Sequence, residues 1–158
     1  MIKQLKIDTR LLHGQVALMW CGVLDVDAIL VANDEVVNND LMKLGMKMAK
    51  PSHVGIAIRT VKDGIALLNN PASHKNKIMI IVKNSDDALE IAESVKGIES
   101  CNIGGMRNIG KEDGKMITAQ ICLTPNDTNN IKKIQDFGIE IDTRTDPADT
   151  KRKFNSLI

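Results

Sequence analysis

The chain has 158 residues, of which 43% are hydrophobic and 26% are charged, and its formal net charge at pH 7 is +1. This length and apolar content suffice for one core, so we predict a single domain over residues 1–158. Lysine and arginine (21) balance aspartate and glutamate (20) without a long run of one sign, and the aromatic residues are one Trp and two Phe. The composition therefore argues against nucleic acid as a partner.

Cysteine usage and hydropathy indicate the compartment. Cys21, Cys101 and Cys122 show no CxxC or Cys/His spacing, so we expect neither a disulfide framework nor a metal site. The N-terminus has no signal-type apolar stretch, and no window approaches the roughly 18 uninterrupted apolar residues of a membrane span. We expect a cytoplasmic protein.

Short β-branched runs alternate with segments of helical period along the whole chain. This pattern is typical of an α/β fold, and we predict a single doubly wound, mainly parallel sheet of six or seven strands with helices on both faces. The predicted strands, in chain order, are Ile2–Ile7, Asp27–Ala32, Val54–Arg59, Lys77–Val82, Ile98–Ile103, Met116–Cys122 and Ile139–Thr143.

The connections carry helix signals. The first helix should open at Gly14 or Gln15 and end at Gly22, which leaves Asp8 to His13 as the loop after the first strand. Later helices should be capped by Thr60 and Ser85 and should start at Thr124-Pro125, and a short final helix should start at Asp146-Pro147.

The helix after Asn39 has the most regular spacing. Leu41, Leu44 and Met48 recur at i, i+3 and i+7 before Pro51 stops the helix. We expect Met42, Met46 and Met48 of this helix to pack in the core as flexible gap-filling side chains.

His13 is the candidate reactive residue. Ligands of open α/β sheets bind outside the carboxyl ends of the strands, and His13 lies in the first such loop. The free N–H groups and positive dipole end of a helix starting at Gly14 favour a bound anion and a neutral, nucleophilic imidazole. A phosphoryl group on His13 would be held by the amides of Gly14 and Gln15.

Other residues could support this chemistry. Arg10 offers a planar fork for two phosphoryl oxygens, and Asp8 could orient Arg10 or the far nitrogen of His13. Gly104 and Gly105 could bring backbone amides to the same group, although a plain turn would use the same residues. We expect positioning and charge, without a metal or cofactor, to lower the barrier.

Residue types alone leave alternatives open. A histidine before a helix is most often a solvated or capping residue. A receiver or ligand-sensing module would instead use Asp8, Asp34 and Lys83 and would be phosphorylated on aspartate. A purely structural interaction domain would have no use for His13. The roles of Asn33, Asp34 and Arg107 stay open at this point.

The segment Lys6–Val16, followed by Trp20, resembles the phosphorylation-site motif of the mannose/fructose/sorbose family of phosphotransferase system (PTS) IIB components. The stretches Asn33–Val36, Asn102–Met106 and Phe137–Glu140 also fall where this family has similar sequences. Lys6, where the family commonly has arginine, keeps the charge but loses the bidentate fork. Thr9, which is often acidic in relatives, is a second departure.

The resemblance implies a phosphotransferase. Its histidine, which maps to His13, accepts phosphate through Nδ1 from a phosphohistidine on a IIA protein and donates it to a sugar entering through the IIC/IID membrane components. Arg10 maps to the motif arginine, and the protein would associate peripherally with the transporter complex. We expect the rim of the contact surface to include Leu11, Leu12, Met106 and Arg107. The identity of the sugar is not readable from the sequence.

Overall fold

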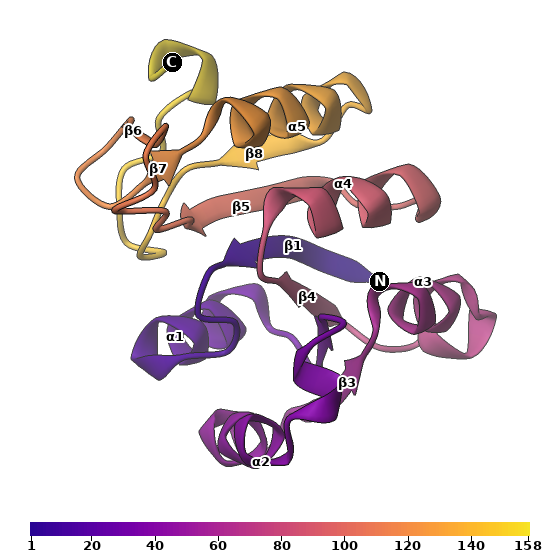
Figure 1. The fold of residues 1–158 in the computed structure, drawn as a ribbon. Coiled ribbons are helices and arrows are strands. Elements are labelled where there is room, and N and C mark those ends of the chain that lie inside the picture. The colour runs from indigo at the N-terminus through magenta and orange to yellow at the C-terminus, as the bar shows by residue number, and fades with distance from the viewer.

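The computed structural model describes the backbone of residues 1–158 and every side chain except that of Val16. Six strands form one sheet in the order β3-β2-β4-β1-β5-β8, and all neighbouring pairs are parallel (Figure 1). The strands are β1 (Ile2–Asp8), β2 (Ala28–Ala32), β3 (Gly55–Arg59), β4 (Ile78–Val82), β5 (Ser100–Gly105) and β8 (Glu140–Asp142), and the helices are α1 (Gly14–Leu24), α2 (Asp40–Ala49), α3 (Val61–Asn69), α4 (Ser85–Ser94) and α5 (Pro125–Asp136).

Helices cover both faces of this sheet, as predicted. Trp20 of α1 and Met46 of α2 pack with one face of the strands, and α3, α4 and α5 bury Leu68, Ile91 and Ile134 against the other (Figure 1). The central strand β4 is buried along its whole length, as expected for a strand covered on both sides. Of the helices that the structure describes, none is both long and apolar enough to cross a membrane.

The carboxyl end of β1 lies at a switch in the strand order. The neighbouring strands β1 and β4 send their connections to opposite faces of the sheet, through α1 and α4 respectively. Loops that diverge in this way leave a crevice at the carboxyl edge, which is where ligands of this fold class bind. The topology therefore places the loop after β1, with His13, at the expected position.

Two predicted elements near the C-terminus are wrong. Met116–Cys122 was predicted as one strand, but it folds back on itself, because Thr118 Oγ1 accepts hydrogen bonds from the amides of Gln120 and Ile121. It forms an antiparallel pair of short strands, β6 (Lys115–Met116) and β7 (Cys122–Leu123). At Asp146-Pro147 the chain makes a turn closed by Asp149 N to Asp146 O at 2.9 Å, and not a helix.

Helix ends follow side-chain capping, with two differences from prediction. Asn84, and not Ser85, caps α4 by accepting from Asp87 N at 2.8 Å, which frees the Ser85 hydroxyl to donate to a buried aspartate of α5. Helix α1 continues past Gly22 to Leu24 and ends where Asp25 adopts a left-handed conformation with φ 53°. Thr60 and Thr124 cap α3 and α5 as predicted.

Gly104 and Gly105 belong to β5 and allow close packing at its carboxyl end. A Cβ on Gly104 would overlap the carbonyl oxygen of Arg144, and a Cβ on Gly105 would lie 2.6 Å from Cγ of Asp8. Real side chains do not tolerate such distances. The absence of side chains therefore lets β5 contact both the loop after β1 and the segment after β8.

We expect Gly104→Ala to lower the free energy of unfolding by about 1–3 kcal/mol or more, the range seen when cores are overpacked. Gly22→Ala is the matched control, because no heavy atom lies within 4 Å of its added Cβ and alanine is the better helix former, worth roughly 0.5–1 kcal/mol. Denaturant unfolding of both variants measures the difference. A Gly104→Ala protein as stable as wild type would contradict the packing role.

Candidate functional site

Asp8 and Arg10 form the base of the loop after β1. The Asp8 carboxylate is buried, and its Oδ1 accepts a hydrogen bond from the Arg10 amide at 2.9 Å. The same oxygen lies 3.8 Å from Arg10 Nε, while the Arg10 side chain stays 39% exposed. The structure thus brings these two predicted site residues together, with the carboxylate orienting a guanidinium that can still reach a ligand.

The loop turns tightly over two buried leucines. Leu11 donates its amide to Asp8 O at 2.9 Å and has φ 58°, a left-handed conformation that non-glycine residues rarely adopt. Leu11 and Leu12 are both buried in the core under α1. They anchor the loop and cannot be rim contacts; Met106 is buried too, and of the four predicted rim residues only Arg107 is exposed.

His13 lies at the start of α1 with its side chain exposed. It occupies the N-cap position with extended backbone, φ −146° and ψ 131°, and its side chain makes no capping hydrogen bond. Gly14 (φ 61°) and Gln15 follow, also exposed. Because the first-turn amides of a helix lack acceptors within the helix, they place positive partial charge at the start of α1, next to His13. Among the hydrogen bonds of the described residues, none joins His13 to Asp8.

Lys6 lies beneath this loop, and its side chain is only 1% exposed. Its Nζ donates to Asn102 Oδ1 at 2.8 Å and lies 5.3 Å from the centre of the Trp20 ring. Burial lowers the pKa of Lys6 to about 8, against the opposing effect of the nearby Asp8 and Asp142 carboxylates. The cation at position 6 therefore contacts the interior, and its alkyl stem and ammonium group support the loop from below.

Arg144 completes this buried cluster from the segment after β8. Its guanidinium carbon lies 5.1 Å from the Trp20 ring centre, and its Nη2 is 2.8 Å from Asp142 Oδ2. Trp20 Nε1 donates to Thr145 O at 3.1 Å, and Asn102 Nδ2 donates to Arg144 O at 2.9 Å. Trp20 belongs to the motif, but Arg144 carries no signal in the sequence, because no spacing or motif connects positions 20 and 144.

Gly104 and Gly105 lie beside the loop, but their polar groups are already paired in part. Gly104 N donates to Asn102 Oδ1 at 3.1 Å, and Gly105 O accepts from Thr9 N at 3.1 Å and from Thr9 Oγ1 at 3.3 Å. These contacts give the glycines a role in joining β5 to the loop. Their binding of phosphate stays a prediction.

Asp34 and Asn33, two polar residues whose roles the sequence leaves open, have local structural roles. Asp34 Oδ1 accepts from Val61 N at 2.9 Å, next to the start of α3. Asn33 Oδ1 accepts from Glu35 N and Val36 N and so closes the turn after β2. These bonds are explained by turn and capping chemistry, without a ligand.

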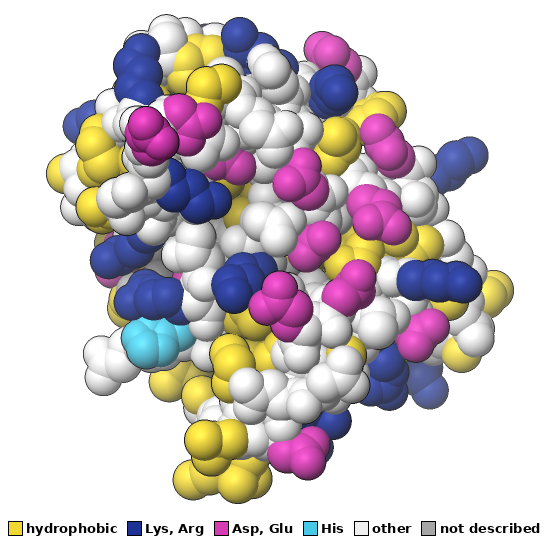
Figure 2. All heavy atoms as spheres, viewed as in Figure 1, with side chains coloured by type: hydrophobic (Ala, Val, Ile, Leu, Met, Phe, Trp, Pro, Cys, Tyr) yellow, Lys and Arg dark blue, Asp and Glu magenta, His cyan; other side chains and the backbone are white. Residues whose placement is uncertain are grey.

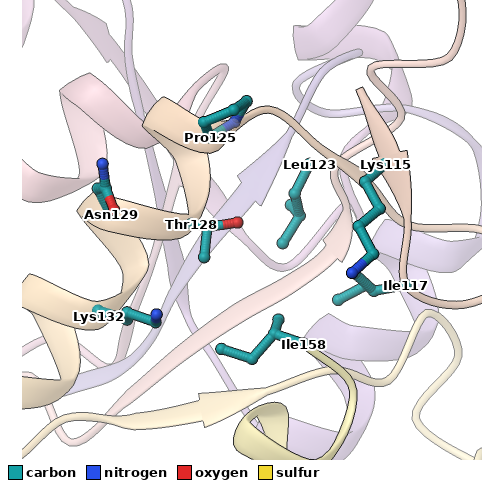
Figure 3. Close-up of a pocket in the computed structure, with 8 residues that line it drawn as sticks. All are labelled: Lys115, Ile117, Leu123, Pro125, Thr128, Asn129, Lys132 and Ile158. Atoms are coloured by element: carbon teal, nitrogen blue, oxygen red, sulfur yellow. The ribbon is translucent and has the colours of Figure 1, made fainter. Parts of the chain in front are cut away.

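A separate hollow of about 450 Å³ lies away from this loop. Figure 3 shows it between α5, the β6–β7 pair and the C-terminal residue, lined on one side by Thr128 and Lys132 and on the other by Lys115 and Ile117. None of the residues from Asp8 to Gln15 lines it. The hollow is therefore separate from the loop that carries His13.

The fold and the loop together define a class of protein: a doubly wound α/β domain that presents an exposed histidine, a carboxylate-oriented arginine and free helix-start amides at its switch point. This arrangement suits the handling of an anion such as a phosphoryl group.

Comparison with known proteins identifies the family. A family model described as "PTS system sorbose subfamily IIB component" matches residues 2–158. A probable phosphotransferase enzyme IIB component of Streptococcus pyogenes serotype M6 is 32% identical, covering 100% of this chain and 99% of that protein. The mannose-specific EIIAB component of Escherichia coli K12 is 30% identical, covering 97% of this chain and 47% of that protein.

Solved structures agree with this result. The chain superposes on the IIBSor domain of the sorbose permease from Klebsiella pneumoniae with a TM-score of 0.90 at 24% identity, covering 99% of this chain and 94% of that one. A PTS-dependent N-acetyl-galactosamine IIB component from Streptococcus pyogenes gives a TM-score of 0.85 at 28% identity, covering 99% and 97%. The chain belongs to the sorbose subfamily of PTS IIB components, and it is a phosphotransferase component of sugar transport.

The buried Lys6 predicts a specific pH dependence of stability. Its pKa is about 8 in the folded protein against an ordinary 10.5, so between these values the unfolded chain binds more protons and the free energy of unfolding rises with pH. We expect the free energy of unfolding of wild type, relative to that of Lys6→Met, to rise by up to a few kcal/mol from pH 7 to pH 10. Denaturant unfolding at several pH values measures it.

Lys47→Met, at an exposed lysine of α2, is the control for this titration and should show no such trend. A wild-type advantage over Lys6→Met that stays flat or falls with rising pH would show that the pKa of Lys6 is not lowered in the folded protein.

Proposed function

We propose that His13 is the phosphoryl carrier of this IIB component. It accepts a phosphoryl group from a phosphohistidine of a IIA protein and donates it to a sugar brought by the IIC/IID membrane components. The observation that carries the proposal is an exposed imidazole at the start of α1, on a loop where buried Asp8 holds Arg10. The receiver alternative has less support, because Asp8 is already engaged with Arg10 and Asp34 with Val61 N.

Each transfer exchanges one P–N or P–O bond for another. A ring nitrogen of neutral His13 attacks the phosphorus, the P–N bond to the IIA histidine breaks, and that histidine recovers its electron pair. In the second step a sugar hydroxyl attacks the phosphorus on His13, the new P–N bond breaks, and the hydroxyl proton leaves to a base on the acceptor side. His13 returns to its starting form, so no oxidant or reductant is needed.

The residues around His13 would stabilise the transferring group. Arg10 would contact its equatorial oxygens, where charge spreads in the transition state, and Asp8 would keep the guanidinium in position. The amides of Gly14 and Gln15 would donate hydrogen bonds to the same oxygens at the helix start. Gly104 and Gly105 would act chiefly by letting β5 approach the loop.

The proposed partners rest on the family. One relative carries the printed name "PTS system mannose-specific EIIAB component", which supports a IIA protein as the phosphoryl donor. We propose that the chain works in the cytoplasm and associates peripherally with the membrane transporter. Arg107, exposed next to the carboxyl end of β5, is the predicted rim residue that can contact such partners.

Phosphorylation by phosphoenolpyruvate, the general PTS carrier proteins and a cognate IIA tests the proposal. We expect one phosphoryl group, stable in base and lost in acid, on wild type and on His53→Gln, which alters another exposed histidine. His13→Gln should take up none while keeping its fold. Equal labelling of His13→Gln, or a base-labile label on aspartate, would overturn the assignment.

Arg10 should matter for rate more than for folding. We expect Arg10→Ala to slow transfer from IIA by about 100-fold or more, as when a transition-state donor is removed, and Arg10→Lys to recover only part of this because it lacks the planar fork. Arg152→Ala, at another exposed arginine, is the control. Rapid-quench measurement of phosphoryl transfer distinguishes these cases, and full activity of Arg10→Ala would exclude the clamping role.

A further inference from the structure

Helix α2 presents its apolar stripe to solvent, and of Met42, Met46 and Met48, which were predicted to pack in the core, only Met46 is buried. Leu41, Leu44 and Met48 are 80%, 55% and 77% exposed, whereas Met46, on the opposite side of the helix, is 5% exposed. Figure 2 shows hydrophobic side chains protruding at the lower edge of the molecule, where Figure 1 places α2. A stripe of this kind in a soluble chain marks a contact surface.

The stripe has the spacing of a helix-pairing seam. Leu41, Leu44 and Met48 occupy a, d and a positions of a heptad, so all three point to the same side of the helix. Asp40 and Lys47, seven residues apart, share one flank of this seam. Gly45 lies on the other flank, and the space where its Cβ would stand is open, so a second backbone can approach closely there.

We propose that α2 packs antiparallel against α2 of a second copy of this chain, around a twofold axis. In this arrangement Leu41 lies beside Leu44 of the second copy. The flank that carries Asp40 and Lys47 faces the same flank of the second copy. Asp40 of each copy then meets Lys47 of the other, which gives two opposite-charge pairs. In a parallel arrangement Asp40 and Lys47 would instead face the Gly45 flank of the second copy, which offers neither of them a residue of opposite charge.

The charges distinguish this occupant from a lipid surface. The Asp40 side chain is fully exposed at the edge of the stripe, and its nearest cation, Lys43 Nζ, is 4.0 Å away at the limit of an ion pair. Anionic lipid would attract Lys47 but repel this carboxylate, whereas a second antiparallel copy pairs both charges. Because a ten-residue helix offers a small contact, we expect a weak, concentration-dependent dimer.

Sedimentation equilibrium up to roughly millimolar protein measures the association, because small interfaces bind weakly. We expect wild type to dimerise and Leu41→Gln/Leu44→Gln to weaken dimerisation about tenfold or more. Phe137→Ser, which removes another exposed apolar side chain at the end of α5, should leave it unchanged. Circular dichroism checks that each variant keeps its fold.

Charge reversal tests the antiparallel arrangement. Asp40→Lys and Lys47→Asp should each weaken the dimer by about threefold to tenfold, and the double variant Asp40→Lys/Lys47→Asp should restore it. Failure of the double variant to restore dimerisation would overturn the antiparallel geometry. A wild type that stays monomeric throughout, binds vesicles of anionic phospholipid through the stripe instead, or dimerises equally without Leu41 and Leu44 would overturn the proposal as a whole.

Discussion

The cation of Lys6 is buried inside the molecule, and the surroundings of the histidine loop are arranged to accept it. An isolated buried charge costs several kcal/mol even after the protein relaxes, so it persists only where hydrogen bonds and opposite charges surround it. Asn102 Oδ1, the Trp20 ring and the nearby Asp8 and Asp142 carboxylates supply that environment. Because these groups come from different segments, accommodating Lys6 ties β1, α1, β5 and β8 together near the loop that carries His13.

The same cluster couples the interior to the loop surface. Asp8 faces two cations, the buried Lys6 and the half-exposed Arg10, so its carboxylate links the core to the proposed phosphoryl site. Gly105 packs against Asp8 and accepts two hydrogen bonds from Thr9. The left-handed Leu11 then turns the chain so that Leu11 and Leu12 enter the core while His13 stays outside. A rigid support of this kind holds reacting groups in place, which suits the proposed role of a carrier that meets two partners in succession.

The two sides of the sheet serve different purposes. Helices α3, α4 and α5 bury their apolar faces in one extensive cluster. On the other side α1 begins at His13, the proposed phosphoryl carrier, and α2 is attached through few buried residues and shows its apolar stripe to solvent. Contacts with other proteins would therefore concentrate on the α1 and α2 side, where exposed side chains can bind a partner because they do not pack in the core.

The sequence by itself determined the features that depend on neighbours along the chain. Alternating strand and helix periods predicted the parallel α/β sheet, Thr60 and Thr124 predicted the starts of α3 and α5, and the Lys6–Val16 motif indicated both the family and the loop that carries His13. These signals are local, because capping, turn chemistry and periodicity act over a few residues.

Only the tertiary structure decided which face of a periodic segment meets the core and which distant side chains meet each other. The spacing of Leu41, Leu44 and Met48 showed that they share one side of a helix, but whether that side is buried depends on where α2 docks. Lys6 departs from the motif, and its contacts with Asn102 and Trp20 depend on packing that the sequence does not reveal; Arg144 carries no signal in the sequence at all. Side-chain period sets relative orientation within an element, whereas burial depends on the packing of elements far apart in sequence.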